Sequence, residues 1–539
     1  MHATGSDGGG RRFRRRRFVA GAAAGAVALA LPAWLRPHGG SLAEAARRNR
    51  FRRPLRIPVE ITDAAIEIPI RRAKAQLLPG RKTGLWTYGG TFPGPTIRRP
   101  AGEPTSVTFS HQLGAGAGEL SAHLHGGHNR SEHDGQPGGL TALQRRSFYC
   151  DISPRLGDAE AGNDLLIAPG GSRTYEYDGM EDGEAERGSF QWYHDHRLDN
   201  TARNVWRGLA GMWIIDDPAA EGPLNLPSGA QDIPLMICDR AFDKRNRLKN
   251  PFKSPGKVPF DQVTGQHIMV NGAITPHAGV APSRHRLRLL NTSNFRAYNL
   301  RFSNGLAMVQ IATEAGLMPN ALRRSKILLG PGERVEIVVD FASARGKRIR
   351  LESVKRPGAR SLGSKPYVGD VMEFRVGSTA VADDTAAIAH GDPLRPLPAW
   401  VDEVLADPLN VDPRPWTIGV ASGIRPRWLI NGAAFDPSEV DRTAEIGEVV
   451  TWRLRNNTRV AHLMHLHHTD WYMLRRNGAT PPAHERCLKE TFLLDPFDEI
   501  VVAGKMSDYT GKYVVHCHML DHEDHGLMSQ FEVVEAPNP

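Results

Sequence analysis

Alternation of apolar and polar residues is the dominant pattern along the chain. Runs such as "PTSVTFSHQL", "HRLRLLNTS" and "EVVTWRLRNNT" place every second residue on an apolar face, as half-buried β-strands do. Turn-forming residues separate these runs, and the 55 Gly and 39 Pro of the chain are typical of a protein rich in strands and loops. Long stretches of helical periodicity are scarce, so the pattern predicts an all-β fold.

A longer pattern occurs three times in the 539 residues. The segments 86–97 ("WTYGGTFPGPTI"), 268–280 ("IMVNGAITPHAGV") and 428–440 ("WLINGAAFDPSEV") each contain an apolar run, then Gly-Gly or Asn-Gly, then a proline. The copies lie about 160–180 residues apart, whereas solenoid repeats are roughly 20–50 residues long. The repeated unit is therefore a domain. We expect three β-sandwich domains, at about 50–218, 219–390 and 391–539.

The N-terminus resembles an export signal. "RRFRRRRFVAGAAAGAVALALPAWL" joins a basic segment to an apolar one, and "AEA" at 43–45 offers a cleavage site of small residues. "RRRFVA" (15–20) resembles a twin-arginine motif. We therefore expect residues 1–45 to be a signal read by the twin-arginine export machinery, with the mature protein periplasmic, secreted or on the cell surface. The alternative is an N-terminal membrane anchor, but the apolar stretch is short for a membrane span.

Charge does not indicate nucleic-acid binding. The formal net charge is +9, and residues 1–45 contain seven Arg and two acidic residues, so the mature chain has a net charge of +9 − 5 = +4. The sequence has no stripe of Arg and Lys with interleaved aromatics. No later apolar run is long enough to span a membrane, so we expect no membrane partner after the signal is removed.

Histidines are concentrated in four short motifs: "HLHGGH", "WYHDHR", "HLMHLHH" and "HCHMLDHEDHGLM". In a strand, residues i and i+2 point to the same face. Each His-x-His pair can therefore direct two imidazoles to one place. The four pairs supply eight imidazoles, which suits a cluster of two or three metal ions such as Cu, Zn, Fe or Ni. The pairs are His123 and His125, His194 and His196, His465 and His467, and His516 and His518.

Cys517 lies between the two histidines of the last pair, so its side chain must point away from both. It therefore belongs to a different site. A blue copper site needs a cysteine, two histidines and a weak axial group. His522, five residues later, and the unpaired His462 are the candidate imidazoles. We expect this segment to connect a mononuclear copper on one face to a metal cluster on the other.

With these residues assigned, the chain resembles the three-domain multicopper oxidases of the laccase type. "HLHG", "WYHDH", "HLMHLH" and "HCHMLDHEDHGLM" match the four motifs of that family in order. The resemblance implies three cupredoxin-like Greek-key domains and four copper ions. By motif, it implies type 2 ligands His123 and His465; type 3 ligands His125, His194, His196, His467, His516 and His518; and type 1 ligands His462, Cys517 and His522.

The axial type 1 position departs from the family pattern. Ten residues after the cysteine, the family position is filled here by Leu527 and not by a methionine. This implies a three-coordinate type 1 copper with a raised reduction potential. Met528 is the alternative ligand, although it has the wrong parity for the same direction if the segment is extended.

Three acidic residues have roles by resemblance. Asp134, after the first motif, and Glu523, directly after His522, match acids that supply protons for dioxygen reduction. The alternative for both is a solvated acidic loop. Glu490, in "LKET", is similar to an acid that orients a type 1 histidine.

The resemblance implies an enzyme that oxidises a small aromatic reductant one electron at a time and reduces dioxygen to water. The closing motifs are similar to those of bacterial spore-coat laccases, bilirubin oxidases and phenoxazinone synthases. A cuprous or other metal-ion oxidase is the alternative, although the 13 Met are scattered along the chain. A copper-free structural relative is the remote alternative. Among the four Cys, a disulfide between Cys150 and Cys238 is one option.

Overall fold

The three repeated segments form the same tight turn. The computed structural model describes residues 50–139, 163–251, 263–356, 367–407, 414–421 and 427–537. In each repeat a strand leads into two residues with positive φ, which is the backbone of a type I′ hairpin turn and favours Gly and Asn. These residues are Gly89 and Gly90 (φ 66° and 90°), Asn271 and Gly272 (47° and 74°), and Asn431 and Gly432 (52° and 82°).

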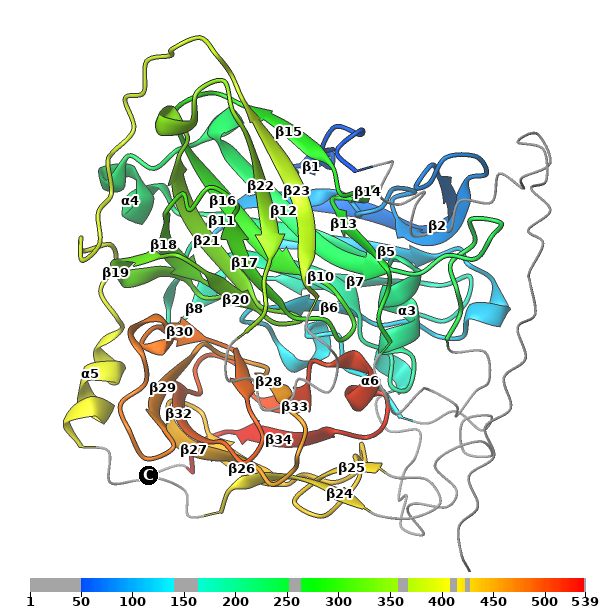
Figure 1. Cartoon of the computed structure of the whole chain (residues 1–539). Coiled ribbons are helices and arrows are strands. Elements are labelled where there is room, and N and C mark those ends of the chain that lie inside the picture. The colour runs from blue at the N-terminus through cyan, green and yellow to red at the C-terminus, as the bar shows by residue number, and fades with distance from the viewer. Residues whose placement is uncertain are drawn as a thin grey trace, which may run out of the picture. The chain divides into compact units, whose positions relative to one another are not determined.

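The strands form three successive pairs of sheets (Figure 1). The first pair has the orders β3–β2–β5–β7 and β1–β4–β11–β10–β6. Their bounds are β1 Glu60–Ile61, β2 Ala65–Ala75, β3 Thr83–Tyr88, β4 Thr96–Pro100, β5 Thr105–His111, β6 Ala122–His125, β7 Ser172–Tyr177, β10 Phe190–Asp195 and β11 Ala210–Asp216. A separate small hairpin joins β8 (Met180–Glu181) to β9 (Glu184–Ala185).

The second pair has the orders β14–β13–β12–β16–β21–β18–β19 and β15–β23–β22–β17–β20. The bounds of the larger sheet are β12 Asp232–Arg240, β13 His267–Val270, β14 Ala273–Ile274, β16 Arg284–Asn291, β18 Met308–Thr313, β19 Gly316–Arg324 and β21 Arg334–Asp340. Those of the smaller sheet are β15 His277–Val280, β17 Tyr298–Phe302, β20 Ile327–Leu329, β22 Arg348–Ser353 and β23 Gly369–Val376.

The third pair has the orders β25–β24–β27–β32–β29–β30 and β26–β34–β33–β28–β31. The bounds of the first of these sheets are β24 Trp416–Ala421, β25 Arg427–Ile430, β27 Val449–Asn456, β29 Trp471–Arg476, β30 Leu488–Lys489 and β32 Glu499–Lys505. Those of the second are β26 Arg442–Glu445, β28 His462–Leu466, β31 Thr491–Leu494, β33 Gly511–Cys517 and β34 Met528–Val534.

Strand pairing follows one scheme in all three pairs. One strand bonds in parallel to a strand that follows the repeated turn further along the chain (β2 to β5, β12 to β16, β24 to β27) and antiparallel to the strand that leads into the turn (β3, β13 and β25). The sequence prediction of an all-β fold is confirmed. All these strands fall within the three expected domain ranges, while the domain limits themselves stay a prediction.

Helices are short and lie between strands. They are α3 Thr201–Arg207, α4 Pro218–Glu221, α5 Ala399–Ala406 and α6 Leu520–Glu523. No helix in the described part of the chain is long and apolar enough to cross a membrane. The expected signal at 1–45 lies outside the described residues.

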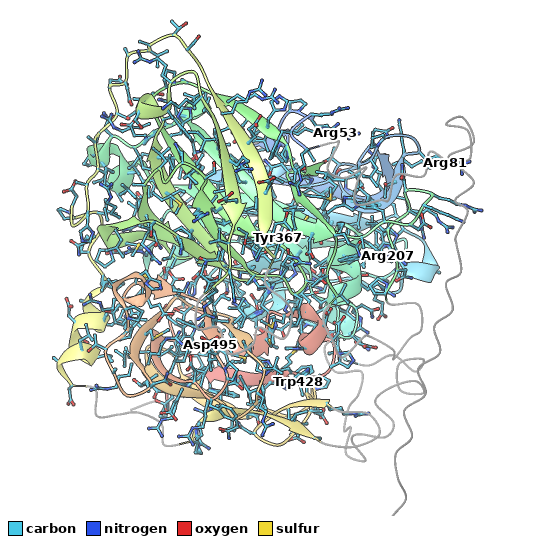
Figure 2. All side chains as sticks on the ribbon, viewed as in Figure 1. Arg53, Arg81, Arg207, Tyr367, Trp428 and Asp495 are labelled. Carbon is cyan, nitrogen blue, oxygen red and sulfur yellow. The ribbon has the colours of Figure 1, made fainter. Side chains whose placement is uncertain are left out.

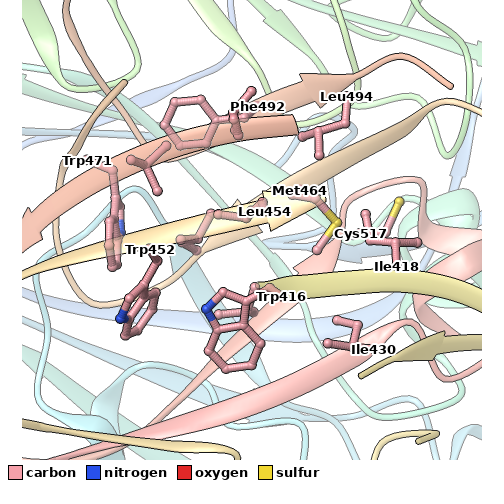
Figure 3. Packing of buried hydrophobic residues seen from close by; sticks show 14 of the residues in the cluster. Trp416, Ile418, Ile430, Trp452, Leu454, Met464, Trp471, Phe492, Leu494 and Cys517 are labelled. Atoms are coloured by element: carbon pink, nitrogen blue, oxygen red, sulfur yellow. The ribbon is translucent and has the colours of Figure 1, made fainter. Parts of the chain in front are cut away.

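Buried side chains fill the space between the strands (Figure 2). In the third pair, one cluster combines residues from both sheets, including Trp416 and Leu454 from one and Met464 and Phe492 from the other. Cys517 is a member of this cluster and is fully buried (Figure 3). The hydrophobic core of the third pair of sheets therefore extends up to the expected type 1 cysteine.

Partly buried ion pairs connect consecutive pairs of sheets. Arg98 on β4 contacts Asp232 on β12 at 3.0 Å, and Asp232 also accepts hydrogen bonds from Arg288 on β16. Arg356 donates to Asp495, at 2.9 and 2.6 Å.

Cysteines give no support to the disulfide option. Cys238 is a free, fully buried thiol on β12, and Cys150 lies outside the described residues.

Candidate metal centres

The four His-x-His pairs start at the ends of four strands. The first two pairs lie on β6 and β10 and the last two on β28 and β33, with the second histidine of the last three pairs one residue beyond its strand. β6 and β10 pair so that His123 faces His194, and β28 and β33 pair so that His465 faces His516. Residues that face each other across a pair share one side of the sheet, so each sheet directs four imidazoles to the same place.

The two sets of histidines meet in one buried cluster. The rings of His123 and His467 are stacked at 4.1 Å between centroids, and those of His125 and His465 at 3.8 Å. The ring of His518 is 4.7 Å from that of His125. All eight predicted cluster histidines are at most 3% exposed. The structure therefore brings together residues that are up to 395 positions apart (123 to 518).

Donor atoms of this cluster point at one another. Three triads made of histidines alone have ligand atoms within 4.8 Å: His123, His125 and His194; His123, His465 and His467; and His196, His467 and His516. Nε2 of His123, His194 and His465 and both ring nitrogens of His518 are buried without a hydrogen-bond partner. Buried polar atoms without partners are costly, and their convergence fits a group of metal ions.

Burial also favours the ligand form of these imidazoles. It is the main cause that lowers the pKa of six cluster histidines well below the ordinary value, and neighbouring imidazoles act in the same direction. The six are His125, His194, His196, His465, His467 and His518. They are therefore neutral near pH 7, and a metal ion is bound by neutral imidazole.

Two buried carboxylates contact the cluster from outside. Asp134 lies 2.7 Å from Nδ1 of His467 and 3.4 Å from Nδ1 of His123. Glu523 lies 3.1 Å from Nδ1 of His516 and 3.9 Å from Nδ1 of His196. Both acids are 1% exposed, so the alternative of a solvated acidic loop is wrong for both. Asp134 accepts a hydrogen bond from Nδ1 of His467, and Glu523 lies close to the Nδ1 atoms of two imidazoles. These contacts favour the tautomer that carries its proton on Nδ1 and leaves Nε2 free.

Glu490 is a third acid at the cluster, which corrects the sequence interpretation. It does not lie beside His462 or His522 as expected. One carboxylate oxygen is 3.1 Å from Nε2 of His125 and also accepts a hydrogen bond from Arg334. The register of β28 with β31 explains this, because His465 faces Thr491 while His462 faces Leu494, three residues further along.

The second candidate centre contains the three expected type 1 residues. Sγ of Cys517 lies 3.7 Å from Nδ1 of His462 and 3.7 Å from Nδ1 of His522. The two Nδ1 atoms are 3.2 Å apart. Burial lowers the pKa of His462 to about 3 and raises the pKa of the Cys517 thiol to about 12. A bound cation would deprotonate this thiol, and the set of one sulfur and two nitrogens fits a blue copper site.

The register of β33 with its neighbours places the two metal centres on opposite sides of the sheet. It also indicates which residue lies at the axial position of the type 1 site. Met464 faces Cys517, whereas His516 faces Met528. Met528 therefore shares the cluster side with His516, and the side of Cys517 is the opposite one. Leu527 belongs to the apolar cluster that contains Cys517. This favours Leu527 over Met528 beside the type 1 sulfur.

Two aromatic rings at this centre had no signal in the sequence. The ring of Trp428 is 4.7 Å from that of His462 and 4.6 Å from that of His522. The ring of Phe295 is 5.3 Å from that of His522. Trp428 lies on β25, and Phe295 lies in the loop between β16 and β17. These contacts therefore depend on tertiary packing.

Comparisons with known proteins agree with this geometry. Residues 70–145 and 401–537 each match a family model described as multicopper oxidase. A laccase of Haloferax volcanii is 31% identical over 97% of this chain and 91% of its own length. A bilirubin oxidase of Albifimbria verrucaria is 29% identical, over 88% and 77%. The solved structure of a multicopper oxidase of Aquifex aeolicus, McoA, aligns with a TM-score of 0.72 at 25% identity, over 89% of this chain and 99% of that one.

Proposed function

Because the chain belongs to the multicopper oxidase family, we propose that it oxidises phenols, aminophenols or related aromatic compounds, with dioxygen as the electron acceptor. Membership of this family implies a copper enzyme that uses dioxygen and a reducing substrate, and the proposal adds the class of that substrate. The observation that carries the proposal is Cys517, whose sulfur meets two imidazoles while its neighbours His516 and His518 belong to the eight-histidine cluster.

The aromatic substrate class rests on the relatives and on the type 1 surroundings. Similar proteins include laccases of Haloferax volcanii and Bacillus subtilis and a bilirubin oxidase. The candidate type 1 centre is enclosed by aromatic and aliphatic side chains, which suits electron transfer from a diffusible organic donor. The 13 methionines are scattered along the sequence, so a methionine-rich cuprous-ion site is not indicated.

In this proposal, His462, Cys517 and His522 hold type 1 copper and the eight paired histidines hold the other three ions. When bound, the copper ions supply one-electron redox chemistry at one site and the four-electron reduction of dioxygen to water at the other. The protein fixes the positions of the metal ligands and connects the two metal centres. The peptide bonds on either side of Cys517 join the sulfur-bearing residue directly to His516 and His518, which gives electrons a short covalent path.

Protons need a separate supply. Reduction of one dioxygen to two waters consumes four protons, and a neutral imidazole bound to a metal ion holds its remaining N–H proton too tightly to be a ready source. Burial alone would raise the pKa of Glu523, but its interactions with His516 and His196 outweigh burial and lower the pKa. We infer that Asp134 and Glu523 orient the histidines and relay these protons.

Export completes the proposal. The arginine-rich start with "RRRFVA" supports passage through the twin-arginine machinery, and we propose that the enzyme acts outside the cytoplasm. Replacing Arg15 and Arg16 with lysine should retain the protein in the cytoplasm, as measured by cell fractionation. Unchanged export of this variant would contradict the assignment.

The substrate class is tested by dioxygen uptake of the copper-loaded protein with a simple phenol, an aminophenol and cuprous ion as separate donors. We expect uptake with the phenol and aminophenol, at four donor molecules per dioxygen. Uptake with cuprous ion alone would replace the proposal by a metal-ion oxidase.

A further inference from the structure

Trp428 lies against both candidate type 1 histidines. It is on β25, at the edge of its sheet, three residues before the turn residue Asn431. Its ring meets the ring of His462 at 81° and that of His522 at 49°, with centroids 4.7 and 4.6 Å apart. Figure 2 shows Trp428 in this C-terminal part of the structure. One indole therefore covers the two imidazoles together.

The centre under this ring is closed to solvent. Cys517 and His462 are 0% exposed, His522 is 2% exposed, and Trp428 itself is 3% exposed. The 5.3 Å ring contact of Phe295 with His522 adds a second aromatic neighbour. Trp428 and Phe295 are therefore part of the buried aromatic surroundings of the type 1 imidazoles.

We propose that Trp428 is a positioning residue that seals the type 1 site, fixes the two imidazole planes and keeps the type 1 reduction potential high. The apolar groups around a blue copper site control its solvent access and its potential. An apolar, water-free environment disfavours the more highly charged oxidised metal, because burying extra charge without solvation is costly. Removing the indole admits water and lowers the potential.

This inference rests on the type 1 assignment in the proposed function.

Three variants test the proposal. Trp428→Ala removes the ring, and Trp428→Phe keeps a smaller ring in the same place. Trp416→Phe is the matched control, since Trp416 is fully buried in the same apolar cluster and its ring contacts are with Trp452 and Arg442. The measurements are the copper content, the blue absorption band, and the type 1 reduction potential from titration against a one-electron redox couple.

We expect Trp428→Ala to shift the equilibrium with the couple at least tenfold toward oxidised type 1 copper, which is 59 mV for one electron. Trp428→Phe should give a smaller shift in the same direction, and Trp416→Phe none. If Trp428→Ala does not fold, Trp428→Phe decides. A blue Trp428→Phe or Trp428→Ala protein with the wild-type potential would overturn the proposal. A wild-type protein that binds copper but lacks the blue band would instead overturn the type 1 assignment, and this inference with it.

Discussion

Replacing Glu523 with glutamine removes a buried negative charge from two cluster histidines without changing the size of the side chain. The Glu523 carboxylate lies 3.1 Å from Nδ1 of His516 and 3.9 Å from Nδ1 of His196. The first distance is that of a hydrogen bond and the second is that of a weaker electrostatic contact. A hydrogen bond to a charged group contributes about 1.5–3 kcal/mol, which corresponds to roughly tenfold to 150-fold in a rate or an equilibrium constant.

The effect should be confined to dioxygen reduction. Loss of an acid that orients metal ligands reduces metal affinity or activity by about 10–100-fold in other metalloenzymes, in agreement with the estimate from the hydrogen bond. Stopped-flow mixing of the fully reduced, copper-loaded variant with dioxygen measures reoxidation. Anaerobic mixing of the oxidised variant with a phenol measures type 1 reduction. We expect the first rate to fall about tenfold or more and the second to stay unchanged.

The matched control is Asp521→Asn, in the same helix. Asp521 is also fully buried, but its carboxylate accepts a hydrogen bond from the backbone N–H of Val263 and has no role at the cluster in this account. Wild-type reoxidation of a fully copper-loaded Glu523→Gln enzyme would refute the reasoning. An equal loss in the control would show that replacing any buried carboxyl group in α6 is enough.

Three other outcomes are expected. Leu527→Met should lower the type 1 reduction potential, because a thioether stabilises the oxidised metal; an unchanged or raised potential in a spectroelectrochemical titration would contradict Leu527 as the axial neighbour. Cys517→Ser should abolish the blue band and leave the copper of the histidine cluster, measured by metal analysis and EPR. Asp232→Asn should lower the free energy of unfolding at pH 7 by about 2 kcal/mol. Burial alone would raise the pKa of Asp232, but Arg288, Arg286 and Arg98 outweigh it and lower the pKa to about 2 from its ordinary value of 3.8. A depressed pKa stabilises the fold above pH 4, and this contribution is lost as the pH falls from about 4 to 2. The difference between wild type and variant in urea unfolding should therefore shrink over that range, and a constant difference would contradict the ion-pair account.

The metal centres could be predicted from the sequence because side chains alternate between the two faces of a strand. The direction of a side chain on a strand depends only on whether its position is odd or even, so His516 and His518 could be assigned to one side and Cys517 to the other. The structure agrees, since Met464 faces Cys517 while His465 faces His516. The all-β fold was readable for the same reason, because alternation along a strand is also a local pattern.

Contacts between strands that are distant in the sequence could not be predicted from this alternation. Glu490 was expected near a type 1 histidine, but its place at His125 depends on the register of β28 with β31 and on Arg334 from the second segment. Trp428 looked like part of a repeated strand-turn pattern, and nothing in that pattern indicated its contact with His522, 94 residues later. Such contacts are set by which strands become neighbours and by their register, and single-sequence periodicity does not contain this information.

The central claim is that Cys517 links a blue copper site to a histidine-bound cluster that reduces dioxygen. The most direct test is an optical spectrum of the copper-loaded protein, recorded under argon after one addition of a phenol and again after admission of air. The account predicts an intense blue band from the copper–thiolate bond, which the phenol bleaches and dioxygen restores. A fully copper-loaded protein without the blue band, or one whose bleached band does not return in air, would contradict the account.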